Sequence, residues 1–182
     1  MRGRYGDGME FSEFDTADEA RATDIARVWA EIPGWVNALV SGRPFGSAEA
    51  LATYAGALAE QWTTADLETA LAHHPRIGAR AAGSGAAASA SRREQASMAS
   101  ADDDVIAAIA AGNTRYEERF GRVFLIRAAG RGPSEMLAEL ERRLDNDPET
   151  EAREATAQLA EIAMLRLRET FSGAQAVPEE NE

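Results

Sequence analysis

The two histidines of this 182-residue chain stand side by side, as His73 and His74, directly before Pro75. With an unperturbed pKa of about 6.5, an imidazole can exchange a proton with a bound molecule near neutral pH. Neighbouring helical residues point about 100° apart, so only one of the two rings can face a given cavity. Pro75 ends the helix here, which would hold the preceding imidazole at the rim of a cavity. Taken alone, such a histidine more often caps the last helical carbonyl groups than catalyses a reaction.

Composition limits the chemistry that this histidine could serve. The chain has no cysteine, and all 19 of its basic residues are arginine. A thiolate nucleophile, lysine Schiff-base chemistry and a nucleotide-binding P-loop are therefore excluded. Adjacent histidines cannot form the i, i+4 pair of a zinc helix, so we expect no metal site. The net charge of −12 would repel a phosphate backbone, so we expect no nucleic-acid partner.

The sequence also predicts where the protein resides. No stretch approaches the roughly 18 apolar residues of a membrane span, and the N-terminus lacks the apolar region of a signal peptide. The absence of cysteine fits a reducing compartment. We therefore expect a cytoplasmic protein with no membrane partner.

Apolar residues recur with a helical period along nearly the whole chain, which predicts an all-α, single-domain multi-helix bundle. We expect a poorly ordered segment over 1–16, the domain over 17–172 and an acidic tail over 173–182. The last helix should have Asp147 as its N-cap and Pro148 in its first turn. The expected helices are 17–29, 47–62, 64–74, 102–120, 134–146 and 147–171.

Two segments interrupt the helical pattern. Residues 78–93 are rich in alanine, serine, glycine and arginine, and each of their three glycines costs about 1 kcal/mol in a helix. We expect a loop there, either solvated or acting as a mobile flap. The short apolar run Arg122–Ile126 lies between helices and is predicted to be a buried extended connector.

Several blocks of the sequence resemble one enzyme family. HPRIG, at 74–78, and SRREQ, at 91–95, resemble the decarboxylases of 2-oxo-4-hydroxy-4-carboxy-5-ureidoimidazoline (OHCU), which complete the oxidative route from urate to (S)-allantoin. The resemblance continues in WVNALVSGRPFGSAEAL, NTRYEERFGRVFLIRAAGR, ELERRLDN and EIAMLRL, and so covers about 35–171. These blocks occur in the family's order, which is a far stronger signal than one pentapeptide.

The resemblance implies a bundle of the OHCU decarboxylase type, a small-molecule substrate (OHCU), a homodimer and no cofactor. The family's substrate carries an imine conjugated to the carbon that loses carbon dioxide. This imine accepts the electron pair, so neither lysine nor metal is required. The protein has only to position the substrate, polarise it and deliver a proton.

The catalytic residues that the resemblance implies are His74, Glu94 and Arg166. His74 matches the family's catalytic histidine, which leaves His73 a structural role. Glu94 matches the second catalytic position, where a carboxylate could act as a base or orient the imidazole. Taken alone, however, SRREQ would be a capping box with Ser91 as its N-cap and Glu94 at N3.

Arg166 matches an arginine on the family's last helix that binds the substrate. It also lies at helical spacing from Leu159 and Ile162, on the face that should be buried. A buried guanidinium needs a partner, and a substrate carboxylate is one candidate. An internal salt bridge is the alternative, with Arg168 and Arg143 as fallback candidates for the substrate contact.

Further positions are implied to bind the substrate. Gln95 would offer both a donor and an acceptor to an amide-rich ring. From the connector, only backbone groups are expected to bind, because its side chains suit core packing equally well. The substrate-binding residues implied are Pro75, Ser91, Gln95, Arg122, Val123, Phe124, Leu125 and Ile126.

Two other functions stay open at this point. A related enzyme could act on another ureido or hydantoin-like substrate with the same catalytic residues. A non-catalytic helical interaction module is the second alternative, and it predicts a surface patch with no deep polar cavity.

Overall fold

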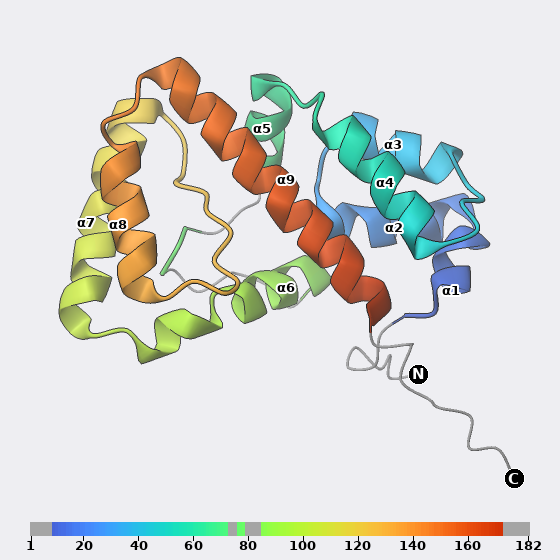
Figure 1. The fold of residues 1–182 in the computed structure, drawn as a ribbon, viewed down its shortest axis with the longest axis horizontal. Helices are drawn as coiled ribbons and strands as arrows, with labels where there is room; N and C mark the ends of the chain where they lie inside the picture. Colours follow the sequence, from blue (N-terminus) through green and yellow to red (C-terminus); the bar gives the residue numbers. More distant parts are fainter. Residues whose placement is uncertain (1–8, 73–75, 79–84, 173–182) are drawn as a thin grey trace, which may run out of the picture. The chain divides into compact units, whose positions relative to one another are not determined.

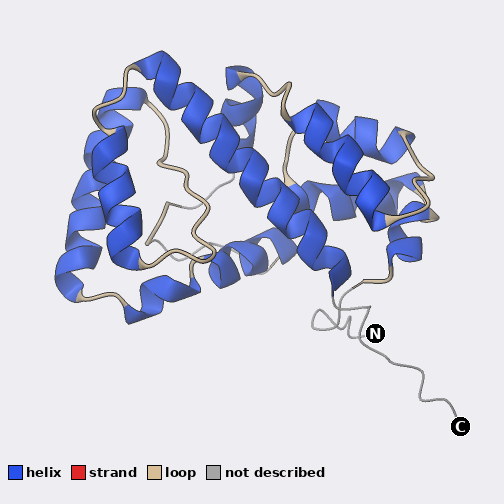
Figure 2. Cartoon of the chain, viewed as in Figure 1, coloured by secondary structure: helices blue, strands red, loops and turns tan. Residues whose placement is uncertain are grey.

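The computed structural model describes residues 9–72, 76–78 and 85–172, and within these ranges the chain is helical with no strand (Figure 2). The predicted all-α fold is therefore confirmed. The helices are α1 (Phe11–Asp15), α2 (Glu19–Trp29), α3 (Pro33–Ser41), α4 (Ala48–Ala59), α5 (Thr64–Leu71), α6 (Ala86–Glu94), the 3-10 helix η1 (Ala96–Ser100), α7 (Asp103–Phe120), α8 (Pro133–Arg143) and α9 (Pro148–Ser172).

Every helix that the apolar period predicted is present, as α2, α4, α5, α7, α8 and α9, and local signals set their ends. Asp147 Oδ1 accepts hydrogen bonds from the backbone N–H groups of residues 149 and 150, both at 3.0 Å, and so caps α9 as predicted. Thr63 and Asp66 form a reciprocal capping box at the start of α5. Gly121 ends α7 in the left-handed conformation, with φ of 68°.

The chain divides into two compact units, each described here by itself. The first unit comprises residues 1–59 and 163–182, and the second is the uninterrupted stretch 60–162. The boundary falls within α9, which contributes to both units.

The first unit corrects the expectation that residues 1–16 are poorly ordered. Phe11–Asp15 forms α1, and Phe14 is fully buried. The Phe14 ring packs against the rings of Trp29 and Phe171, with centroid distances of 5.1 and 6.3 Å. This aromatic burial fixes a short helix whose polar and glycine-rich surroundings hid it in the sequence. Residues 1–8 and the acidic tail 173–182 lie outside the described residues.

In the second unit, α7 and α8 lie side by side (Figure 1). A Cβ atom on Gly112 of α7 would lie 2.6 Å from Cδ2 of Leu140 on α8, so glycine is what permits this close approach. Leu140 and Ile109 are buried in the apolar core between the helices.

The segment between α7 and α8 is the predicted buried connector. It forms neither helix nor strand over 123–128, and Phe124, Leu125 and Ile126 are all buried. Figure 1 shows it running back along the length of the helix pair, so that α8 can start beside the start of α7. The connector therefore depends on side chains of other elements to fix its backbone.

The expectation of a loop over 78–93 is wrong in its second half, because Ala86–Glu94 forms α6. The glycines stop at Gly85, which is the N-cap, and the alanine-rich run after it is free to form a helix. Ser91 lies inside this helix, so the capping-box interpretation of SRREQ is also wrong. Residues 79–84, where the flap was expected, lie outside the described residues.

Candidate active site

A small hollow, partly open to solvent, lies in the second unit. Its wall brings together two segments that are far apart in the sequence, α6 and the connector. Five of the residues predicted to form the site are among those that line it. The lining residues are Ile77, Ser91, Glu94, Gln95, Leu125, Ile126, Ala128 and Ile162.

The polar side of the hollow comes from the end of α6. Ser91, Glu94 and Gln95 follow one another at i, i+3 and i+4, so they share one helix face. Ser91 is buried, and Glu94 and Gln95 are half-buried. The neighbouring Arg92 and Arg93 are exposed. The arrangement offers a hydroxyl, a carboxylate and an amide to a bound molecule.

The side-chain amide of Gln95 has a defined orientation. Its Oε1 accepts a hydrogen bond of 3.0 Å from the backbone N–H of Gly78. Because Gly78 presents a donor, the atom that faces it must be the oxygen rather than the nitrogen. The expectation that Gln95 offers donor and acceptor equally is therefore refined: its oxygen already has a partner, and its Nε2 group is the donor left for a ligand.

The last three residues of the HPRIG block are held by α7. Arg76 forms a two-pronged ion pair with Glu117, with both N–O distances at 2.5 Å. Nδ2 of the buried Asn113 donates a hydrogen bond of 3.0 Å to the carbonyl of Ile77. Asn113 and Glu117 are one helical turn apart, and neither was predicted from the sequence to belong to the site. Their signal was polar side chains at i, i+4 within a block already recognised as NTRYEERFG.

The connector is held at two points that flank Ile126. The carbonyl of Leu125 accepts a hydrogen bond of 2.7 Å from Arg143 Nη1, and the backbone N–H of Arg127 donates one of 2.9 Å to Gln158 Oε1. Between them, the N–H and C=O groups of Ile126 make no hydrogen bond to any described residue. An extended segment with unpaired backbone groups at the site was the expectation for this stretch.

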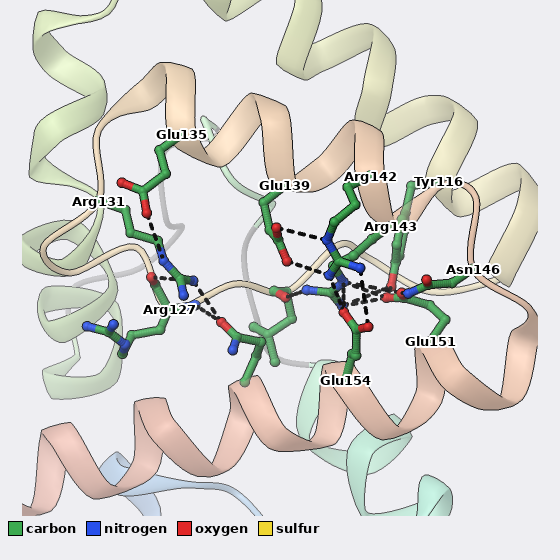
Figure 3. A network of polar contacts seen from close by, with 12 residues as sticks. Tyr116, Arg127, Arg131, Glu135, Glu139, Arg142, Arg143, Asn146, Glu151 and Glu154 are labelled. Atoms are coloured by element: carbon green, nitrogen blue, oxygen red, sulfur yellow. Dashed lines mark hydrogen bonds and ion pairs between the residues drawn. The ribbon is translucent and has the colours of Figure 1, made fainter.

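A buried ionic network lies behind the connector (Figure 3). Arg143 pairs with Glu151, and both side chains are 1% exposed. Tyr116 donates its hydroxyl hydrogen to Glu151, and Asn146 Nδ2 donates to the same carboxylate at 2.8 Å. Burial, together with this hydrogen bond, raises the pKa of Tyr116 well above its ordinary value, so the phenol stays protonated. Arg143 is thus committed to protein partners, which argues against its fallback role as a substrate ligand.

A second arginine forms ion pairs next to this network. Arg142, the neighbour of Arg143, forms ion pairs with Glu139 and Glu154 at 2.6 and 2.5 Å. These hydrogen bonds lower the pKa of both carboxyl groups below their ordinary values.

Arg166 is not among the residues that line the hollow. Arg166 belongs to the first unit, where it is 6% exposed and donates a hydrogen bond of 3.2 Å to the carbonyl of Val28. Its predicted burial is confirmed, and its contact with substrate stays a prediction. Arg122, Val123 and Phe124 do not line the hollow. His73, His74 and Pro75 lie outside the described residues.

Among the described residues, no three His, Cys, Asp or Glu side chains gather in a way that could hold a metal ion. None of the helices in the described ranges combines the length and the apolarity needed to cross a membrane.

The sequence matches the model of a known family over most of its length. The sequence model of OHCU decarboxylase matches residues 15–168. The chain belongs to the OHCU decarboxylase family. The family inferred from the HPRIG and SRREQ blocks is therefore confirmed.

Relatives of known name agree with this membership. An OHCU decarboxylase of Amia calva is 33% identical over 134 residues, 72% of this chain and 77% of that protein. A uric acid degradation bifunctional protein of Arabidopsis thaliana is 29% identical over 132 residues, 71% of this chain and 41% of that protein. The chain spans less than half the length of three of the curated relatives that it matches.

The fold also matches a solved member of the OHCU decarboxylase family. A crystal structure of an OHCU decarboxylase in the presence of (S)-allantoin has a TM-score of 0.70 and 25% sequence identity to this chain. The match covers 82% of this chain and 98% of the other.

The contact between Asn113 and Ile77 leads to a stability prediction. Asn113→Ala leaves the buried Ile77 carbonyl without its donor, so the free energy of unfolding in urea should fall by about 1–3 kcal/mol. Amide exchange at Gly78 should become faster, because the segment loses an anchor. The control is Thr114→Ala, an exposed neighbour on the same helix, which should change the unfolding free energy by less than about 0.5 kcal/mol. Equal effects of the two substitutions would contradict the anchoring role.

Proposed function

We propose that this protein converts OHCU to (S)-allantoin by decarboxylation, without a metal or a cofactor, as a step in urate degradation. The observation that carries the proposal is the convergence of Ser91, Glu94 and Gln95 with the unpaired backbone groups of Ile126 around one hollow. Membership of the family supports the same reaction, as does the Amia calva relative. We further propose that the protein works in the cytoplasm as a homodimer, which rests on its lack of cysteine and on the family resemblance.

The proposed reaction requires the protein only to position and polarise the substrate and to deliver a proton. The bond between the ring carbon and the carboxylate carbon breaks, and its electron pair moves toward the conjugated imine of the substrate itself. Carbon dioxide leaves, and the imine nitrogen takes up a proton. The ring carbon that lost carbon dioxide becomes a carbonyl as its hydroxyl proton is released, and a proton delivered to one face of the neighbouring ureido-bearing carbon sets the (S) configuration. His74 is the proposed acid/base residue, because its pKa range suits proton exchange near neutral pH.

The lining groups have complementary roles in this proposal. Nε2 of Gln95 donates to a carbonyl oxygen of the ring or the ureido group, since its own oxygen is held by Gly78. The N–H and C=O of Ile126 pair with an amide edge of the substrate. Glu94 orients the imidazole of His74 or accepts a proton from the substrate hydroxyl.

Arg166 is the proposed ligand of the substrate carboxylate. A guanidinium presents two parallel N–H donors, which match the two oxygens of a carboxylate. Its place in the EIAMLRL block of α9, where the family resemblance implies a substrate-binding arginine, supports this role. Pro75, which follows His74, is proposed to border the substrate.

The activity is tested on freshly made substrate. OHCU generated from urate by an oxidase and a hydrolase decays slowly to racemic allantoin. The protein should speed this decay and yield (S)-allantoin, followed by circular dichroism, and a strong chelator should leave the rate unchanged. Racemic product at an unaltered rate would refute the proposal. Turnover of a different ureido or hydantoin-like compound instead would favour the related enzyme.

The two histidines provide a matched pair of variants. His74→Ala should lower kcat by about 100-fold or more, the usual contribution of a positioned acid/base group. His73→Ala should leave kcat within about two-fold, because neighbouring helical residues point about 100° apart and only one of the two rings can serve the site. Both variants should melt within a few degrees of the parent protein. Equal losses of kcat would show that the assignment of roles is wrong.

The proposed contact between Arg166 and the substrate carboxylate should affect the binding of substrate more than the binding of product. Arg166→Lys keeps the charge but loses the two-pronged geometry, so substrate binding should weaken by about 1.5–3 kcal/mol. (S)-allantoin has lost the carboxylate, so its affinity should change much less. The exposed Arg153 on the same helix, changed to lysine, is the control. A large drop in melting temperature with parallel losses of both affinities would mean that Arg166 is purely structural.

A further inference from the structure

The connector lacks the regular secondary structure that would fix the position of its backbone groups. Over 123–128 it has no helical or strand hydrogen bonds of its own. Two of its residues, Leu125 and Ile126, nevertheless line the hollow. Backbone groups can bind a ligand with defined geometry only if something else fixes the peptide planes.

Two side chains fix the peptide planes on either side of Ile126. Arg143 Nη1 binds the carbonyl of Leu125 at 2.7 Å, and Gln158 Oε1 binds the N–H of Arg127 at 2.9 Å. In a trans peptide unit the C=O and N–H groups point in opposite directions. When Arg143 draws the Leu125 carbonyl toward itself, the N–H of Ile126 must point the other way. When Gln158 holds the Arg127 N–H, the carbonyl of Ile126 is likewise turned away from it.

The anchoring atoms are themselves immobilised. The guanidinium of Arg143 lies 4.7 Å from the centre of the Phe124 ring and is paired with the buried Glu151 (Figure 3). Gln158 Oε1 also accepts a hydrogen bond of 3.0 Å from Arg131 Nη1. Replacing a buried ion pair by apolar residues is often neutral or stabilising, so stability alone does not explain the pair of Arg143 and Glu151. The hydrogen bond from Arg143 to the Leu125 carbonyl gives the pair a second role, which is to hold the connector.

We propose that Arg143 and Gln158 are positioning residues. Arg143 holds the Leu125 carbonyl and Gln158 holds the Arg127 N–H, so that Ile126, between them, presents an unpaired N–H and C=O to an amide-bearing ligand. The proposal deepens the function proposed above and rests on it for the identity of the ligand. Neither side chain is required to touch the substrate. Their effect passes through the Ile126 backbone.

Gln158 offers the cleaner test, because it is half-buried and its removal leaves no buried charge. Gln158→Leu removes the acceptor, and Gln158→Glu retains an oxygen at the same place. Titration of ¹⁵N-labelled protein with (S)-allantoin should shift the Ile126 amide signal in the parent protein. The affinity should fall at least five-fold in Gln158→Leu and return to within about two-fold in Gln158→Glu. KM for OHCU should rise in Gln158→Leu more than kcat falls, with the melting temperature within a few degrees.

Arg143→Lys tests the second anchor. A lysine can pair with Glu151 but lacks the rigid fork that reaches the Leu125 carbonyl at the same time, so (S)-allantoin should again bind at least five-fold more weakly. If this variant fails to fold, the Gln158 pair still decides the matter. Exposed Arg153, which pairs with Glu149 on α9, is the control when changed to lysine.

Two results would overturn the inference. One is an Ile126 amide that does not respond to (S)-allantoin in the parent protein, and the other is Gln158→Leu binding as tightly as the parent. Failure of the proposed function looks different, because the parent protein would then not turn over OHCU. Binding of (S)-allantoin at Ile126, weakened in Gln158→Leu, would support the positioning roles even in that case.

Discussion

The buried ion pair between Arg143 and Glu151 is the interaction on which the second unit depends. Glu151 receives hydrogen bonds from α7 through Tyr116 and from the turn before α9 through Asn146. Arg143 also donates a hydrogen bond to the Leu125 carbonyl, so the position of the guanidinium fixes the connector as well. A charge buried at 1% exposure is costly unless every partner is present. The pair therefore ties the spacing of three helices to the path of an otherwise irregular connector.

Helix α7 organises both sides of the hollow from a single face. Asn113, Tyr116 and Glu117 occupy i, i+3 and i+4, so they project from neighbouring positions. Asn113 and Glu117 hold the segment 76–78 that follows the two histidines, while Tyr116 belongs to the network behind the connector. Displacement of α7 would thus disturb the HPRIG block and the connector together.

Periodicity predicted the long helices because amphipathic faces recur over several turns, and caps such as Asp147 placed their ends. It missed α1, α3 and α6. For α1 and α6 the deciding forces were aromatic burial of Phe14 and the N-cap at Gly85. At the site, the family blocks predicted Ser91, Glu94, Gln95 and Ile126 among the residues that now line one hollow. Asn113 and Gln158 could not be predicted, because their importance lies in which backbone groups they meet. Only the folded chain brings Gln158 to the N–H of Arg127, 31 residues earlier.

The division of the chain within α9 bears on the order of events during synthesis. The second unit is one continuous stretch, so all of its segments leave the ribosome before the end of α9 does. The first unit takes its segments from both sides of this stretch: Trp29 Nε1 donates a hydrogen bond of 2.9 Å to Thr170, 141 residues later. Between the synthesis of helices α1 to α4 and that of the end of α9, Trp29 and Phe14 lack the contacts that Thr170 and Phe171 provide. The interval is one in which these aromatic side chains are available to chaperones or to other nascent chains.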